Sequence, residues 1–157
     1  MSQAEEIAKA ARFGLGGRGY AGSSRWAGYA TKKMPDLLVQ SQDETVVIAQ
    51  IEEPAAVEIA DSIARIEGID VIFAGPADLS VGMGYKNQDS NELKAALKKV
   101  GVAAKENGKG YASFIGDADQ AKSWAEDYGV NMFFVGSEHS FMRNKANEIS
   151  LRVKEIS

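Results

Sequence analysis

The feature that most constrains the fold is a fourfold alternation of short apolar runs with longer segments of helical periodicity. The apolar runs span residues 45–51, 70–74, 110–115 and 131–135. The helical segments span residues 55–66, 90–107, 117–128 and 137–156. Strands made of such continuous apolar runs are typical of parallel sheets buried on both faces. The alternation therefore predicts an α/β fold in which helices connect parallel strands.

The rest of the chain predicts shorter elements. Two short helices are expected at residues 3–12 and 34–42, separated by a glycine-rich segment, and a loop is expected at residues 75–89. A length of 157 residues corresponds to one domain. We therefore expect residues 1–157 to form a single domain.

Composition excludes several classes of site and partner. The chain has no cysteine and a single histidine, so disulfides, cysteine-ligated metals, a cysteine nucleophile and a two-histidine metal site are excluded. The net charge of −4 disfavours nucleic acid and anionic membranes as partners. No run of about 18 apolar residues and no secretory signal occurs, so we expect a cytoplasmic protein.

Polar residues follow the first two predicted strands. Gln50 and Glu52 lie on one side of the first strand because successive side chains alternate. Asp78 follows the second strand within the hexapeptide Gly75-Pro76-Ala77-Asp78-Leu79-Ser80. Neighbouring parallel strands lie about 4.8 Å apart, so the two carboxylates are expected to converge and to suit Mg²⁺ or Mn²⁺.

Each of these acidic residues also has a purely structural interpretation. Glu52 or Glu53 could simply favour the N-terminus of the helix that follows. Asp78 could form an Asx-turn or cap a helix. Taken singly, each residue fits this interpretation better, and only the pair favours a metal site.

Two further segments could bind an anion. Residues 16–25 contain four glycines, two arginines and two serines, and form either an anion-binding segment or a flexible surface loop. Ser137 follows the fourth strand and either binds a carboxylate or phosphate or caps the last helix. His139 lies early in that helix, and we interpret it as a surface residue rather than a catalytic one.

Several motifs together resemble one family. Gln50-Ile51-Glu52 and residues 75–80 resemble the paired motifs of the HpcH/HpaI aldolases, which are metal-dependent class II 2-keto-acid aldolases of the phosphoenolpyruvate/pyruvate superfamily. Residues 18–23 are similar to that family's Arg-Gly loop. Residues 82–85 and 134–137 are similar to its later segments. The resemblance extends over essentially all of the chain.

The resemblance implies a (β/α)8 TIM barrel, of which this chain is the C-terminal half with about four βα units. It implies cleavage of 4-hydroxy-2-keto acids to pyruvate and an aldehyde, through a pyruvate enolate stabilised by a divalent cation, Mg²⁺ or Mn²⁺. Glu52 and Asp78 would bind that cation. A homo-oligomer is also implied.

The same resemblance assigns substrate contacts. Gln50 would hydrogen-bond the keto acid, and the backbone N–H groups of Ala77 and Asp78 would hold its carboxylate. Ser137 would lie on the aldehyde side of the site. The expected further contacts on that side are Arg18 and Ser23.

One departure from the family limits the expected activity. A complete barrel has about 250 residues and eight strands, and the family's catalytic histidine, its acidic partner and its arginine belong to the other half. Neither His139 nor Arg18 or Arg25 matches them, so we expect no catalytic residue within this chain and no activity from it alone. The alternatives are another lyase of the superfamily, of the citramalyl-CoA or malyl-CoA type, or a non-catalytic half-barrel that assembles with a partner.

Overall fold

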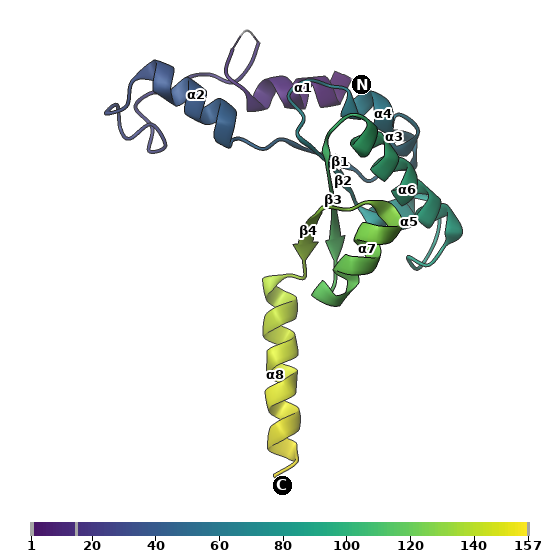
Figure 1. Cartoon of the computed structure of the whole chain (residues 1–157). Coiled ribbons are helices and arrows are strands. Elements are labelled where there is room, and N and C mark those ends of the chain that lie inside the picture. Colours follow the sequence, from purple (N-terminus) through teal and green to yellow (C-terminus); the bar gives the residue numbers. More distant parts are fainter. Residues whose placement is uncertain (1, 15, 157) are drawn as a thin grey trace.

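A four-stranded parallel sheet forms the centre of the molecule. The computed structural model describes residues 2–14 and 16–156. The strands are β1 (Ile48–Ile51), β2 (Val71–Ala74), β3 (Gly110–Ile115) and β4 (Met132–Val135). They pair in the order β1-β2-β3-β4, and every pair is parallel (Figure 1). This confirms the predicted α/β class and a sheet with four of the eight strands of a closed barrel.

Helices connect the strands and precede the sheet. They are α1 (Ser2–Ala11), α2 (Met34–Glu44), α3 (Pro54–Glu58), α4 (Ala60–Ala64), α5 (Pro76–Gly82), α6 (Asn91–Glu106), the 3-10 helix η1 (Ala118–Gln120), α7 (Ala121–Tyr128) and α8 (Glu138–Lys154). Within the described residues, none of these helices has the length and apolar character needed to cross a membrane.

Two sequence predictions about helices are wrong in detail. The helix expected at residues 55–66 is divided into α3 and α4 at Ile59, where φ is −109° and ψ is 17°. The loop expected at residues 75–89 contains α5, which begins at Pro76 because the fixed φ of proline suits the first helical position.

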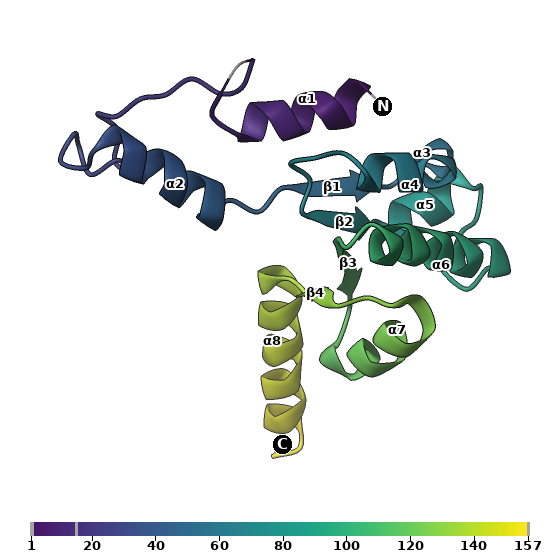
Figure 2. The same cartoon turned by 45° about the horizontal axis from the view of Figure 1, so that its top comes forward.

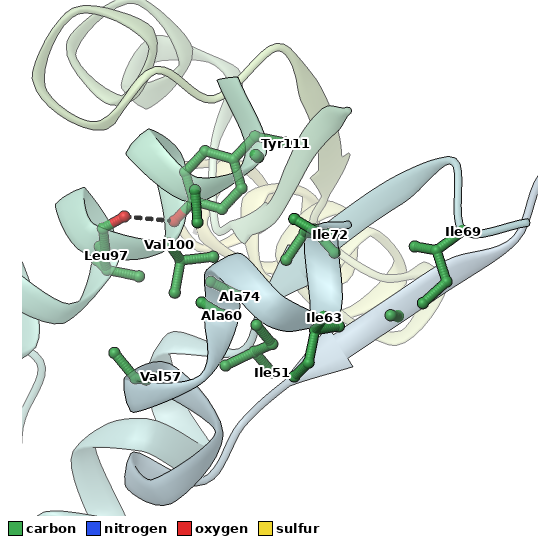
Figure 3. Packing of buried hydrophobic residues seen from close by; sticks show 14 of the residues in the cluster. Ile51, Val57, Ala60, Ile63, Ile69, Ile72, Ala74, Leu97, Val100 and Tyr111 are labelled. Atoms are coloured by element: carbon green, nitrogen blue, oxygen red, sulfur yellow. Dashed lines mark hydrogen bonds between the residues drawn. The ribbon is translucent and has the colours of Figure 1, made fainter. Parts of the chain in front are cut away.

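The hydrophobic core lies between one face of the sheet and the helices that cover it. Strand residues such as Ile51, Ile72 and Tyr111 pack there with Leu97 and Val100 of α6 (Figure 3). The Tyr111 hydroxyl donates a hydrogen bond of 2.9 Å to the Leu97 carbonyl oxygen. Burial raises the pKa of this phenol, which therefore stays neutral and can donate that bond.

The opposite face of the sheet is open along β1 and β4, which corrects the expectation of burial on both faces for these two strands. In the middle strands, Val71 and Ala112 of that face are buried. Along β1 burial alternates, with Ile48 and Gln50 exposed and Ala49 and Ile51 buried. No residue of β4 is buried, and Phe134 is 43% exposed. The rings of Phe73 and Phe134 are 5.3 Å apart, centroid to centroid. In a closed eight-stranded barrel, one face of every strand is covered by strands across the interior, which four strands cannot provide.

Helix α8 stands apart from this core. Figures 1 and 2 both show it extending away from the sheet beyond β4, and none of its residues is buried. Its N-terminus is nevertheless well formed by a capping box at Ser137. Local capping rather than tertiary packing therefore defines where this helix begins.

Asp70 connects the start of the sheet to the N-terminal segment. Its Oδ2 accepts hydrogen bonds from Arg12 Nη2 at 2.8 Å and from the Val47 backbone N–H at 2.7 Å. Arg12 Nη1 also donates to the Gln42 carbonyl oxygen at 2.9 Å. One carboxylate therefore joins the end of α1, the approach to β1 and the start of β2.

We predict that Gly101→Ala destabilises the protein by about 1–2 kcal/mol, because overpacking typically costs about 1–3 kcal/mol. A Cβ at this position of α6 would lie 2.1 Å from the Tyr128 carbonyl oxygen and 3.0 Å from the Tyr111 ring. The free-energy cost of this overpacking exceeds the gain of about 1 kcal/mol from replacing a helical glycine with alanine. The free energy of unfolding, measured in urea, tests this.

The matched control is Val102→Ala in the same helix. Val102 is 54% exposed, so this change should stay within about 0.5 kcal/mol. Equal stability of Gly101→Ala and wild type would contradict the close packing of α6 on α7.

Candidate functional site

The carboxyl ends of β1 and β2 bring three polar residues to one edge of the sheet. Gln50 lies within β1, and Glu52 follows the strand directly. Asp78 lies in the first turn of α5, immediately after β2. Because β1 and β2 pair in parallel, with Ile51 opposite Ala74, their ends lie side by side.

The three side chains surround a common point above Gly75. A Cβ placed on Gly75 would lie 3.2 Å from Glu52 Cβ, 3.5 Å from Gln50 Nε2 and 3.6 Å from Asp78 Oδ2. We call the space bounded by these three atoms the Gly75 gap. The structure therefore brings together Gln50, Glu52 and Asp78, as the strand pairing predicts.

The two carboxylates are held differently. Gln50 Nε2 donates a hydrogen bond of 2.7 Å to Glu52 Oε2, which fixes that carboxylate against β1. The carboxylate of Asp78 makes no hydrogen bond or ion pair within the described part of the chain. Both residues are exposed, so a ligand that enters from solvent can reach them.

The structure supports one structural interpretation of these acidic residues and not the other: they lie near helix N-termini, but no side chain caps a helix there. The N-cap of α5 is Gly75, and no side chain caps that helix, so Asp78 is not a cap. The N-cap of α3 is Glu53, whose side chain also makes no capping bond. Acidic residues near a helix N-terminus are still favourable, but capping does not explain the positions of Glu52 and Asp78.

Backbone and side-chain bonds fix the floor of the Gly75 gap. The Gly75 N–H donates to the Ile51 carbonyl oxygen at 3.0 Å, between Gln50 and Glu52. The Gly75 carbonyl oxygen accepts from the Leu79 N–H at 3.0 Å. Buried Ser113 of β3 donates from Oγ to the Ala74 carbonyl oxygen at 2.9 Å. Sequence reasoning missed Ser113, whose only signal is a hydroxyl within an apolar run.

The backbone N–H groups of Ala77 and Asp78 also face the start of α5. Both precede Leu79, which makes the first bond of this helix to a carbonyl four residues back. Helix geometry therefore provides no intrahelical acceptor for them. N–H groups of this kind can bind the carboxylate of a ligand.

The segment with Arg18 and Ser23 lies elsewhere. The Arg18 guanidinium stacks 4.2 Å from the centre of the Phe13 ring and 5.6 Å from that of Trp26. Phe13 follows Arg12, which binds Asp70 at the amino end of β2, whereas Asp78 lies beyond the carboxyl end. The structure thus does not bring Arg18 to the Gly75 gap. Ser23 is exposed in the same segment, between α1 and α2.

Ser137 and His139 lie at the start of α8. Ser137 Oγ accepts a hydrogen bond of 3.2 Å from the Ser140 N–H, and the Ser137 N–H donates to Ser140 Oγ at 2.9 Å. This confirms Ser137 as the helix cap, while its role toward a substrate stays a prediction. The His139 side chain is 83% exposed, with Nδ1 3.5 Å from Glu138 Oε1, as expected of a surface residue.

The donor set at the Gly75 gap fits a hard divalent cation that keeps open positions. In the described part of the chain, no three histidine, cysteine, aspartate or glutamate residues cluster as metal ligands. Mg²⁺ in enzymes is commonly held by only one or two carboxylates, with water and substrate oxygens in the remaining positions. The pair Glu52 and Asp78 suits that mode, whereas a site that binds metal through protein ligands alone is not present there.

Comparison with known proteins identifies the family. The family model described as HpcH/HpaI aldolase/citrate lyase matches residues 1–144. The chain belongs to this family. It is 33% identical over 151 residues to the hydroxypyruvate/pyruvate aldolase of Delftia acidovorans, covering 92% of this chain and 54% of that protein. It is 33% identical over 156 residues to a 4-hydroxy-2-oxo-heptane-1,7-dioate aldolase of Escherichia coli, covering 96% of this chain and 57% of the relative.

Solved structures of this family share the fold. A family member from Burkholderia cenocepacia superposes with a TM-score of 0.87 at 26% identity, covering 98% of this chain and 61% of the other. An HpcH/HpaI aldolase from Desulfitobacterium hafniense gives a TM-score of 0.81 at 25% identity, covering 94% and 57%. The chain thus spans about half the length of the curated relatives it matches.

We predict that Ser113→Ala lowers the free energy of unfolding by about 1–3 kcal/mol, because it leaves the buried Ala74 carbonyl oxygen without its side-chain donor. Ser123→Ala is the control, since Ser123 Oγ makes the same kind of bond to the Gln120 carbonyl oxygen but is exposed. Urea unfolding compares the two variants. Equal effects would show that Ser113 does not hold the end of β2.

Proposed function

We propose that this chain provides the metal-binding and keto-acid-binding half of a divalent-metal-dependent aldolase, a carbon–carbon lyase that cleaves 4-hydroxy-2-keto acids to pyruvate and an aldehyde. The observation that supports this most directly is the convergence of Gln50, Glu52 and Asp78 on the Gly75 gap. The named activities of the relatives, a hydroxypyruvate/pyruvate aldolase and a 4-hydroxy-2-oxo-heptane-1,7-dioate aldolase, agree with it.

Glu52 and Asp78 would hold the cation, Mg²⁺ or Mn²⁺, through one carboxylate each. Oxygen ligands on exposed side chains are suited to these hard ions, and the open positions leave room for substrate oxygens. When bound, the cation would act as a Lewis acid toward the keto acid and stabilise the negative charge that develops as the carbon–carbon bond breaks.

The other residues of the site would bind and orient the keto acid. The Gln50 amide is already directed at Glu52 by a 2.7 Å hydrogen bond, so it lies where it can contact a ligand of that carboxylate. The N–H groups of Ala77 and Asp78 would hold the substrate carboxylate at the start of α5. Together these groups fix the keto acid in one orientation, and orientation is itself a large part of catalysis.

Fewer residues of this chain lie where they could contact the aldehyde than lie where they could contact the keto acid. Ser137 follows β4 at the same edge of the sheet as Glu52 and Asp78, so we keep it as an aldehyde-side residue. Arg18 and Ser23 would need a different conformation of residues 16–25 to reach that edge. We propose them as substrate contacts only in such a closed conformation.

Proton transfer needs a group that the described site does not present. His139 is exposed on α8, and the side chains around the Gly75 gap are an amide and two carboxylates assigned to the cation. We therefore propose that the acid–base residue comes from outside this chain. A non-catalytic assembly role is the second candidate, favoured by the open sheet face with exposed Phe114, Met132 and Phe134. Either role fits a homo-oligomer and a single, partial-barrel domain.

We predict that Glu52→Ala and Asp78→Ala each abolish binding of Mn²⁺, because each removes one of the two protein ligands. Isothermal titration calorimetry with MnCl₂ on the folded full chain measures this. Glu53→Ala is the control, since Glu53 is the adjacent carboxylate and is not among the residues that bound the Gly75 gap. Unchanged affinity in both site variants would refute the metal assignment.

We also predict that the 157-residue chain alone produces no pyruvate from a 4-hydroxy-2-keto acid in the presence of Mg²⁺ or Mn²⁺. The reason is the lack of an acid–base residue at the site. Pyruvate release, followed by coupled reduction to lactate, provides the measurement. Turnover that Glu52→Ala abolishes would show that the chain contains its own acid–base group and that our assignment is wrong.

A further inference from the structure

We propose that Gly75 is a positioning residue whose missing side chain keeps the Gly75 gap open for the cation held by Glu52 and Asp78. This inference rests on the proposed function, because it assigns a role within the same site. It extends that function to a residue with no chemical group of its own.

The distances around the gap place a Cβ against the base of the Glu52 side chain and close to a carboxylate oxygen of Asp78. The Cβ would be 3.6 Å from Asp78 Oδ2 and 3.2 Å from Glu52 Cβ. A cation bound by a carboxylate lies about 2.0–2.6 Å from its oxygen, depending on the ion. A methyl group this close to both residues would therefore compete with the ion and with the movement of Glu52 toward it.

Backbone conformation does not explain the glycine. At Gly75 φ is −91° and ψ is 93°, a conformation that any L-residue adopts. Several other glycines of the chain, such as Gly84 and Gly129, have positive φ and are needed for that reason. At Gly75 the requirement is space rather than conformation.

The surrounding bonds prevent the backbone from moving away to accept a side chain. The Gly75 N–H is bonded to Ile51, its carbonyl oxygen to Leu79, and the preceding carbonyl oxygen to Ser113. A Cβ would press by a few tenths of an ångström on Glu52 Cβ, and it would meet Gln50 Nε2 and Asp78 Oδ2 at ordinary contact distances. This predicts a loss of metal affinity that is separable from a loss of stability.

Gly116 provides a matched control. It follows β3 as Gly75 follows β2, and its φ is also outside the left-handed region. A Cβ there would meet only Gln120 Oε1, at 3.6 Å. Gly116→Ala therefore repeats the substitution at the same edge of the sheet without filling the Gly75 gap.

The experiment measures Mn²⁺ affinity by calorimetry for wild type, Gly75→Ala and Gly116→Ala, together with the melting temperature of each metal-free protein. We expect Gly75→Ala to bind Mn²⁺ about 10–100-fold more weakly, the range typical of residues that orient metal ligands. Its melting temperature should stay close to that of wild type, and Gly116→Ala should match wild type in both measurements.

Each other outcome overturns a distinct statement. Wild-type affinity in Gly75→Ala, or an equal loss in Gly116→Ala, overturns the role of Gly75 and leaves the metal assignment of Glu52 and Asp78 intact. No Mn²⁺ binding by the wild type overturns the proposed metal site itself, and the role of Gly75 with it.

A measurement on the wild type covers the case in which Gly75→Ala does not fold. Mn²⁺ is paramagnetic and broadens the amide signals of nearby residues in a proton–nitrogen correlation spectrum. Substoichiometric Mn²⁺ should remove the Gly75 signal before that of Gly129, which precedes β4 at the opposite edge of the sheet. A Gly75 signal that persists as long as that of Gly129 overturns the inference.

Discussion

The parallel pairing of β1 with β2 is the constraint on which the site depends. The ladder ends with the bond from the Gly75 N–H to the Ile51 carbonyl oxygen, which lies between Gln50 and Glu52 in the chain. In a parallel sheet the carboxyl ends of neighbouring strands lie on the same edge. A one-residue shift of this register would turn Gln50 and Glu52 to the opposite face of β1 and separate them from Asp78.

The two faces of the sheet differ in how far their residues are buried. Ile51, Ile72 and Tyr111 point toward the helices and are buried, whereas Gln50 and Phe134 point toward the open face. The covered face provides the hydrophobic core, so it maintains the strand order that the site needs. The other face is exposed along β1, and a polar residue such as Gln50 is tolerated there because it remains in contact with water.

Local chemistry made much of this predictable from the sequence. The β-branched runs fixed the strands, and the alternation of side chains placed Gln50 and Glu52 on one face, where the structure has them near Asp78. What failed depended on tertiary context. Burial on both faces of β1 requires strands that this sheet does not contain. The break between α3 and α4 at Ile59 has no glycine or proline beside it that would predict it from the sequence. The role of Gly75 became visible only through distances to side chains 23 and 25 residues earlier in the chain.

The absence of compensating charge at the site argues for a ligand there. The ion pairs of the described residues engage other acids, such as Asp70 with Arg12 and Glu58 with Lys99, while neither Glu52 nor Asp78 has a cationic partner among them. The side chains of Glu52 and Asp78 both lie close to Gly75, and natural sequences depart from ordinary charge pairing mainly at functional sites. A divalent cation would use both carboxylates, which neither a helix cap nor a solvated surface position would do. A cation that binds the folded chain and not the unfolded one would also stabilise the fold.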